Sequence, residues 1–143
     1  MNAKTKKPLQ DFKMTVKLKL SALWASVMFC YIYGDYFGLY VPGTLKSMLD
    51  GKMGPLGPTT QGVLLGTTAL MVIPSLMPLL SLMLRPSLNR IVNIVLGIVY
   101  SIVMLVSLPG AWRFYQAIGV VEILLTGLVV WHAWTWPREP HDA

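Results

Sequence analysis

Two acidic residues, Asp35 and Glu122, lie within otherwise apolar stretches and are the strongest candidates for chemistry. An ionisable side chain inside the hydrocarbon layer of a membrane costs several kcal/mol, so it needs a functional or a structural reason. Two carboxyl groups in a pocket of low dielectric constant do not both ionise readily, because burial and like charge each favour the protonated form. The pair would suit proton-coupled binding or transfer of a small solute.

The stretches that would position these acids are long and apolar. Of 143 residues, 55% are hydrophobic and 13% are charged. Residues 53–84 and 91–112 contain no Asp, Glu, Lys or Arg, and residues 114–137 are interrupted only by Glu122 and His132. Such runs exceed the roughly 18–20 residues that mark a membrane span. The composition excludes a disordered chain, argues against a soluble globule, and predicts an all-α bundle of four transmembrane helices.

Proline and glycine divide the predicted membrane domain, residues 20–136, into its spans. A short polar tail, residues 137–143, follows the domain, and a basic tail, residues 1–19, precedes it. One amphipathic turn is also expected at the membrane surface over residues 44–49. The four spans are expected over residues 20–41, 62–84, 91–108 and 115–136.

The positive charge predicts how the bundle is oriented. Four spans place both termini on one side of the membrane. If that side is the cytoplasm, cytoplasmic segments hold nine Lys and Arg residues and the outer loops hold three. The positive-inside rule therefore predicts N-in and C-in, in a bacterial-type inner membrane. A cleaved signal peptide is the alternative for the first stretch, but no small-x-small cleavage pattern follows it.

The two acids are expected at the same depth. Asp35 lies six residues before the end of the first span and Glu122 seven residues after the start of the fourth. At 1.5 Å per residue, both would lie roughly 9–10 Å below the outer ends of their helices. If these spans are neighbours, the carboxyl groups would face each other in a pocket open to the outside. Tyr31 and Tyr100 are the best candidates to hydrogen-bond them.

Each acid also has a second interpretation. If residues 36–40 lie flat at the membrane interface, Asp35 is simply in contact with water. Glu122 fits equally well as an interhelical hydrogen bond that fixes helix packing. Pro74 and Pro78 should free backbone carbonyls and kink the second span, which is more often a packing bend than a binding site.

Other chemistry has little support. Arg85 and Arg90 are candidates to bind lipid phosphates at the cytoplasmic boundary. The chain has one cysteine, Cys30, and His132 is isolated from other metal ligands, so we expect no disulfide within the chain, no metal and no cofactor. No catalytic set can be assembled. The net charge of +6 is concentrated beside the first span, which argues for a membrane flank and against nucleic acid.

Short motifs across the chain carry a family resemblance. In order and spacing they resemble a family of small bacterial four-span membrane proteins known only as a domain of unknown function. The resemblance implies a membrane bundle and no activity, and DoxX-like four-span proteins are similar at the level of the fold only. The motifs are LSALW at 20–24, YIYGD at 31–35, LLG at 64–66, MVIP at 71–74, NRIVN at 89–93 and WHAW at 131–134, with Glu122.

Three classes of function follow. The first is a small-solute or proton-linked carrier or binder that uses a pocket near Glu122 and Asp35. The second is a non-catalytic membrane subunit or assembly partner, in which Glu122 fixes helix packing. The third, with the least support, is a membrane redox or lipid enzyme. The expected partners are membrane lipids, together with a second copy of the chain or another membrane protein.

Overall fold

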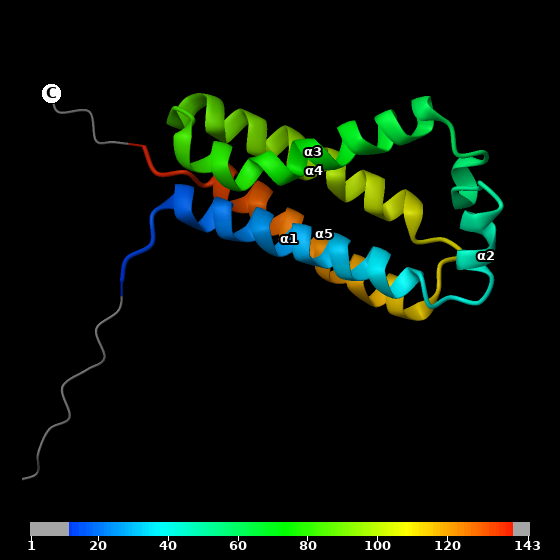
Figure 1. Cartoon of the computed structure of the whole chain (residues 1–143). Coiled ribbons are helices and arrows are strands. Elements are labelled where there is room, and N and C mark those ends of the chain that lie inside the picture. The colour runs from blue at the N-terminus through cyan, green and yellow to red at the C-terminus, as the bar shows by residue number, and fades with distance from the viewer. Residues whose placement is uncertain (1–11, 139–143) are drawn as a thin grey trace, which may run out of the picture.

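A computed structural model describes residues 12–138 (Figure 1). Three lysines of the expected basic tail, Lys4, Lys6 and Lys7, lie outside the described residues, as does most of the expected C-terminal tail. Within residues 12–138 the fold is all-helical and has no strand, as predicted. The elements are α1 (Val16–Gly38), α2 (Thr44–Leu49), a 3-10 turn η1 (Gly54–Leu56), α3 (Gln61–Met83), α4 (Pro86–Ser107) and α5 (Arg113–Trp134).

Local sequence explains where the long helices begin. The hydroxyls of Thr15 and Thr60 accept hydrogen bonds from backbone N–H groups in the first turns of α1 and α3. Pro86 occupies the first turn of α4, where its missing N–H costs nothing. These starts differ from the predicted spans. The cap at Thr15 begins α1 four residues before the predicted start at residue 20, so Lys17 and Lys19 lie within the helix.

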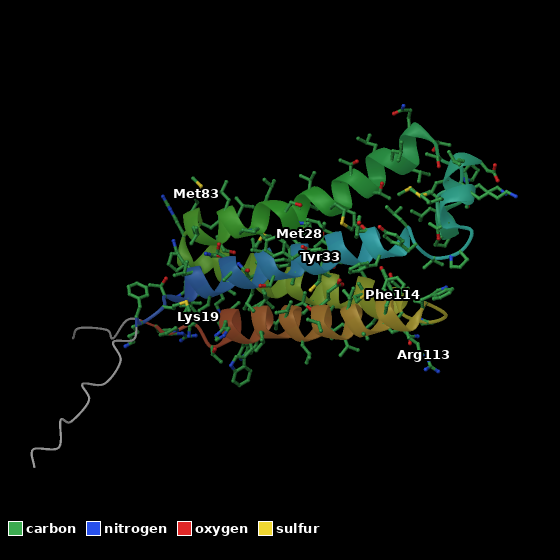
Figure 2. The ribbon with its side chains drawn as sticks, turned by 60° about the horizontal axis from the view of Figure 1, so that its bottom comes forward. Lys19, Met28, Tyr33, Met83, Arg113 and Phe114 are labelled. Atoms are coloured by element: carbon green, nitrogen blue, oxygen red, sulfur yellow. The ribbon has the colours of Figure 1, made fainter. Side chains whose placement is uncertain are left out.

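The four long helices are arranged around α1 and α5 (Figure 1). α1 packs between α3 and α5, and α4 packs along α5, whereas α3 and α4 contact each other only sparsely. The described chain begins and ends at the same end of the bundle, which we call the terminal end. The opposite end, which carries α2, is the loop end. Figure 2 shows Lys19 and Met83 at the terminal end and Arg113 and Phe114 at the loop end.

All four long helices are long and apolar enough to cross a membrane. Each has 22 or 23 residues, close to the roughly 20 residues that a bilayer requires. Large apolar side chains point away from the bundle on every one of them, including Ile32, Leu65, Val106 and Leu124. The protein is therefore a multi-pass membrane protein whose outer surface suits contact with lipid.

A fully buried polar network joins three helices in the terminal half of the bundle. Trp24 Nε1 donates to Asn93 Oδ1 at 2.7 Å, and Asn93 Nδ2 donates to Asn89 Oδ1 at 2.6 Å. Asn89 Nδ2 then donates to the carbonyl of Ser81 at 2.6 Å. All four residues are completely buried. Each of the three donor nitrogens therefore has at least one acceptor inside the bundle, and the network closes this half of it.

The α3 helix continues through Pro74 and Pro78 but turns away from its neighbours in its first half (Figure 2). Pro74 removes the backbone N–H that would otherwise bond the carbonyl of Leu70. The hydroxyl of Tyr100 on α4 donates to this carbonyl at 2.6 Å. The freed carbonyl predicted near Leu70 is therefore satisfied by a side chain from another helix, close to the point where α3 and α4 separate.

Candidate functional site

The separation of α3 from α4 leaves a cavity of about 550 Å³ in the loop half of the bundle. We call it the loop-end cavity. Its volume lies within the range of about 300–1,000 Å³ that is usual for small-molecule sites. All four long helices contribute to its wall, together with the segment that follows α2. The lining residues are Tyr31, Asp35, Met53, Leu56, Thr67, Thr68, Leu70, Met71, Val72, Ser75, Val103, Met104, Ser107 and Tyr115.

Two of the predicted site residues, Tyr31 and Asp35, line this cavity one helical turn apart on α1. Asp35 is exposed at the cavity surface. Tyr31 is 9% exposed, and its hydroxyl has no hydrogen-bond partner in the described part of the chain. The structure thus places an acid at the cavity surface and an unpaired hydroxyl beside it.

Glu122 on α5 is buried behind this wall. Its side chain is 2% exposed, and its Oε2 atom is enclosed with no hydrogen-bond partner among residues 12–138. The α5 helix packs directly on α1, so the neighbouring position assumed for the first and fourth spans is observed. The carboxyl group lies in the neighbourhood of Tyr31 and Asp35 on α1. Leaving a buried polar atom unpaired lowers the stability of a protein by about 1–3 kcal/mol, so packing alone does not explain this burial.

The two acids differ in depth. Gly34 packs against Tyr115, because a Cβ at Gly34 would lie 3.8 Å from the Tyr115 ring. A Cβ at Gly34 would also lie 3.8 Å from Ile118. Asp35 is therefore level with the first turns of α5, whereas Glu122 lies four residues beyond Ile118 and seven beyond Tyr115, or about 6–10 Å deeper. The expectation of a common depth assumed that both helices end at the same level. The contact at Gly34 sets a different register, and Tyr31 lies between the two acids in depth.

The remaining titratable groups near Glu122 belong to α1, α4 and α5. They are Cys30, Tyr31 and Asp35 on α1, Tyr100 on α4 and Tyr115 on α5, while α3 carries no titratable side chain. Tyr100 was expected to hydrogen-bond the acids. Its hydroxyl instead donates to Leu70, because Pro74 leaves that carbonyl without its helical donor.

A second cavity, of about 710 Å³, lies at the terminal end between the start of α4 and the end of α5. We call it the terminal-end cavity. Arg90 and Arg138 line it, and Arg85 does not. The guanidinium of Arg90 lies 5.8 Å from the centre of the Trp134 ring and donates to the Trp134 carbonyl at 3.3 Å. One of the two predicted lipid-binding arginines therefore lies in a cavity, with a partner that was not predicted.

Sequence reasoning missed the buried network of Trp24, Asn93, Asn89 and Ser81. The two asparagines, four residues apart at the start of an apolar run, were the available signal, because that spacing places both on one face of a helix. No cluster of three or more potential metal ligands occurs within residues 12–138. The network is structural in its geometry, since its amide protons are used within the bundle.

Comparison with known proteins gives a family for this chain and no function. The model of a family of unknown function, DUF6326, matches residues 9–142. No curated protein matches the chain. No solved structure matches it either. The expected similarity to DoxX-like proteins is not shown by these comparisons and stays a prediction. Because the match covers nearly the whole sequence, the chain belongs to this family of unknown function.

Proposed function

We propose that this membrane protein binds and carries a small solute at the loop-end cavity, and that solute binding is linked to protons held by Asp35 and Glu122. The observation that carries the proposal is a pair of buried polar atoms without a hydrogen-bond partner among residues 12–138, the Tyr31 hydroxyl in the cavity wall and Glu122 Oε2 near it. A fold that served only to pack helices would gain stability by pairing or removing them.

The arrangement of the acids supports a link to protons. Asp35 faces the cavity, Tyr31 lies one turn deeper, and Glu122 is buried beyond it. A proton released from Glu122 can reach the cavity through the Tyr31 hydroxyl, which has both a proton to give and lone pairs to accept one. Binding of a solute near Asp35 would then change the proton occupancy of Glu122 through their electrostatic coupling.

One half of the bundle is open and the other is closed, and a carrier requires such a difference. The loop half is open between α3 and α4, whereas the terminal half is closed by the buried network around Asn93. A carrier that exposes its site to one side at a time needs one closed half in each state.

Solute binding can be tested by blocking the cavity. Purified protein in lipid nanodiscs is screened for thermal stabilisation by small cationic, neutral and anionic solutes. A bound solute at 100 times its Kd should raise the free energy of unfolding by about 2.7 kcal/mol. Ser75→Trp fills the cavity wall and should abolish this gain, while Ala69→Trp, on α3 but outside the lining, should retain it. Equal stabilisation of both variants contradicts the proposal.

The proton link needs its own measurement. Solute is added to the protein in weakly buffered solution, and proton release or uptake is followed with a pH indicator. We expect a proton change with the wild type and none with Glu122→Gln. If the solute binds both proteins and neither releases nor takes up a proton, the protein is a solute binder without proton coupling.

A membrane subunit is the alternative function, and the sparse contact between α3 and α4 favours it. A helix of a partner, or of a second copy, would then occupy the loop-end cavity. Site-specific cross-linking from Thr68, which lines that cavity, distinguishes the two. A cross-link to another membrane helix supports the subunit, whereas a cavity that stays accessible to small thiol reagents at Thr68→Cys supports the carrier.

We further propose that the protein lies in a bacterial-type inner membrane with both termini in the cytoplasm, and that the terminal-end cavity holds an anionic lipid headgroup. Arg90 and Arg138 line that cavity together with apolar Ile91 and Ile94, which suits a phosphate with its acyl chain alongside. Native mass spectrometry should show fewer bound anionic lipids for Arg90→Gln than for Arg113→Gln at the opposite end.

A further inference from the structure

Three of the six hydroxyl side chains that line the loop-end cavity can only accept hydrogen bonds from a ligand, whereas those of Tyr31, Thr68 and Tyr115 keep a proton to donate. Thr67, Ser75 and Ser107 all line the cavity. Each donates its one proton to a backbone carbonyl of its own helix, at distances of 3.1, 2.7 and 2.8 Å respectively. A hydroxyl whose proton is used in this way offers only lone pairs to a ligand. At these three positions the cavity can therefore accept hydrogen bonds but not donate them.

The charge of the cavity wall also favours a ligand that donates hydrogen bonds. Asp35 is the one charged side chain among the lining residues, and no Lys, Arg or His lies in this wall. Glu122 adds a second acidic group nearby, within range of the charge of Asp35. A negative group in a cavity of low dielectric constant attracts a cation more strongly than it would in water. The charge of Asp35 and the three hydroxyls that can only accept hydrogen bonds favour a ligand with a positive charge and N–H donors.

The rest of the wall is apolar and polarisable. Met53, Met71 and Met104 contribute thioether side chains from three different segments, and Tyr31 and Tyr115 contribute aromatic rings. Methionine adapts to ligands of irregular shape, and aromatic faces attract cations. This wall suits a ligand whose charged group is attached to an apolar body.

We propose that the ligand of the loop-end cavity is a small protonated amine with an apolar body, whose N–H groups bond to Asp35 and to the lining hydroxyls. The inference rests on the proposed function and adds the class of solute. It uses the direction of three hydrogen bonds, each made within its own helix, and the negative charge that Asp35 gives to the cavity wall.

Four probes of similar carbon skeleton test the ligand class with the full chain in lipid nanodiscs. They are benzylammonium, benzyl alcohol, benzoate and benzyltrimethylammonium. Benzylammonium should bind about tenfold or more tightly than the alcohol or the carboxylate, because a hydrogen bond to a charged group contributes about 1.5–3 kcal/mol. Benzyltrimethylammonium keeps the charge but has no N–H, so it should bind less tightly than benzylammonium.

Matched variants assign the effect to Asp35. Asp35→Asn should weaken benzylammonium binding about tenfold or more, and Asp35→Glu, which keeps the charge, should restore most of it. Asp50→Asn removes an exposed acid at the same end of the bundle and outside the cavity, so it should change nothing. Unchanged binding to Asp35→Asn overturns the inference.

The outcomes also separate this inference from the proposed function. If benzyl alcohol or benzoate binds as tightly as benzylammonium, and Ser75→Trp abolishes that binding, the cavity is a solute site and the ligand class is wrong. Equal binding of benzyltrimethylammonium and benzylammonium overturns the assignment to a protonated amine. If none of the probes binds, the ligand class is overturned, and the solute screen with Ser75→Trp decides the proposed function separately.

Discussion

Burying Glu122 without a hydrogen-bond partner for Oε2 among residues 12–138 lowers the stability of the folded protein. The side chain is 2% exposed, and Oε2 has no hydrogen-bond partner in the described chain. A group that fixed two helices together would instead show a hydrogen bond to the neighbouring helix. At this residue, stability and function make opposite demands, as they do at many binding sites.

This opposition predicts that Glu122→Met stabilises the protein. Methionine has a similar length and no polar atoms, so the substitution removes a desolvation cost of about 1–3 kcal/mol. We expect the free energy of unfolding in mixed micelles to rise by part of that amount. Val121→Met, at the neighbouring exposed position, serves as the control and should change little. A loss of stability in Glu122→Met would support the interhelical role instead.

Tyr100 makes the opposite kind of contribution. Its hydroxyl bonds the Leu70 carbonyl that Pro74 leaves free, and Tyr100→Phe removes this bond alone. We expect a loss of about 0.5–1.5 kcal/mol in the free energy of unfolding, the usual net contribution of one hydrogen bond. Tyr33→Phe, at an exposed tyrosine, should be neutral in the same measurement. Equal effects of both substitutions would show that the hydroxyl of Tyr100 contributes nothing specific.

The individual residues could be predicted only in part from sequence. Two acids in apolar runs marked the region, and both lie at or behind the loop-end cavity. The partner of Tyr100 could not be predicted, since it depends on which helix lies opposite. The depth of Glu122 relative to Asp35 was also inaccessible, because the contact of Gly34 with Tyr115 sets the register between their helices.

At the scale of elements, a close contact between α4 and α5 depends on Gly97. A Cβ at Gly97 on α4 would lie 2.7 Å from Val130 Cγ2 and 3.3 Å from the Thr126 carbonyl oxygen on α5. Valine is stiff about its first side-chain torsion, and a backbone oxygen inside a helix cannot move alone. The absence of a side chain at Gly97 therefore sets how closely α4 and α5 approach.

Gly97→Ala should therefore destabilise the bundle by about 1–3 kcal/mol, the usual cost of overpacking. Gly127→Ala on α5 is the matched control, because a Cβ there meets no atom within 4 Å. That substitution should be neutral or stabilising, since alanine favours the helix by about 1 kcal/mol over glycine. Denaturant unfolding of both variants decides the point, and equal stabilities would contradict it.

Helix positions were more predictable than helix packing. Proline and glycine mark the loops, so each of the four long helices overlaps one predicted span, although α1 and α4 begin earlier than predicted. The divergence of α3 from α4 was not predicted, although only two residues separate these helices. A short link fixes one end of a helix pair, and the contacts along both helices fix the rest. Those contacts join α3 to α1 and α4 to α5.

At the scale of the whole molecule, the described chain begins and ends at one end of the bundle, which agrees with four crossings. Basic residues are more numerous at that end. The described residues hold six there, namely Lys13, Lys17, Lys19, Arg85, Arg90 and Arg138, against Lys46, Lys52 and Arg113 at the loop end. Because cytoplasmic flanks carry the excess of Lys and Arg, the asymmetry predicts that the loop-end cavity opens away from the cytoplasm.

Single-cysteine labelling tests this orientation. In a Cys30→Ser background, Met48→Cys places a thiol on α2 at the loop end, and Thr135→Cys places one after α5 at the terminal end. With the protein in the inner membrane of a bacterial host, a membrane-impermeant maleimide should label Met48→Cys in intact spheroplasts and Thr135→Cys only after permeabilisation. The reverse pattern would place the loop-end cavity on the cytoplasmic side, and the proposed solute would then enter the cavity from the cytoplasm.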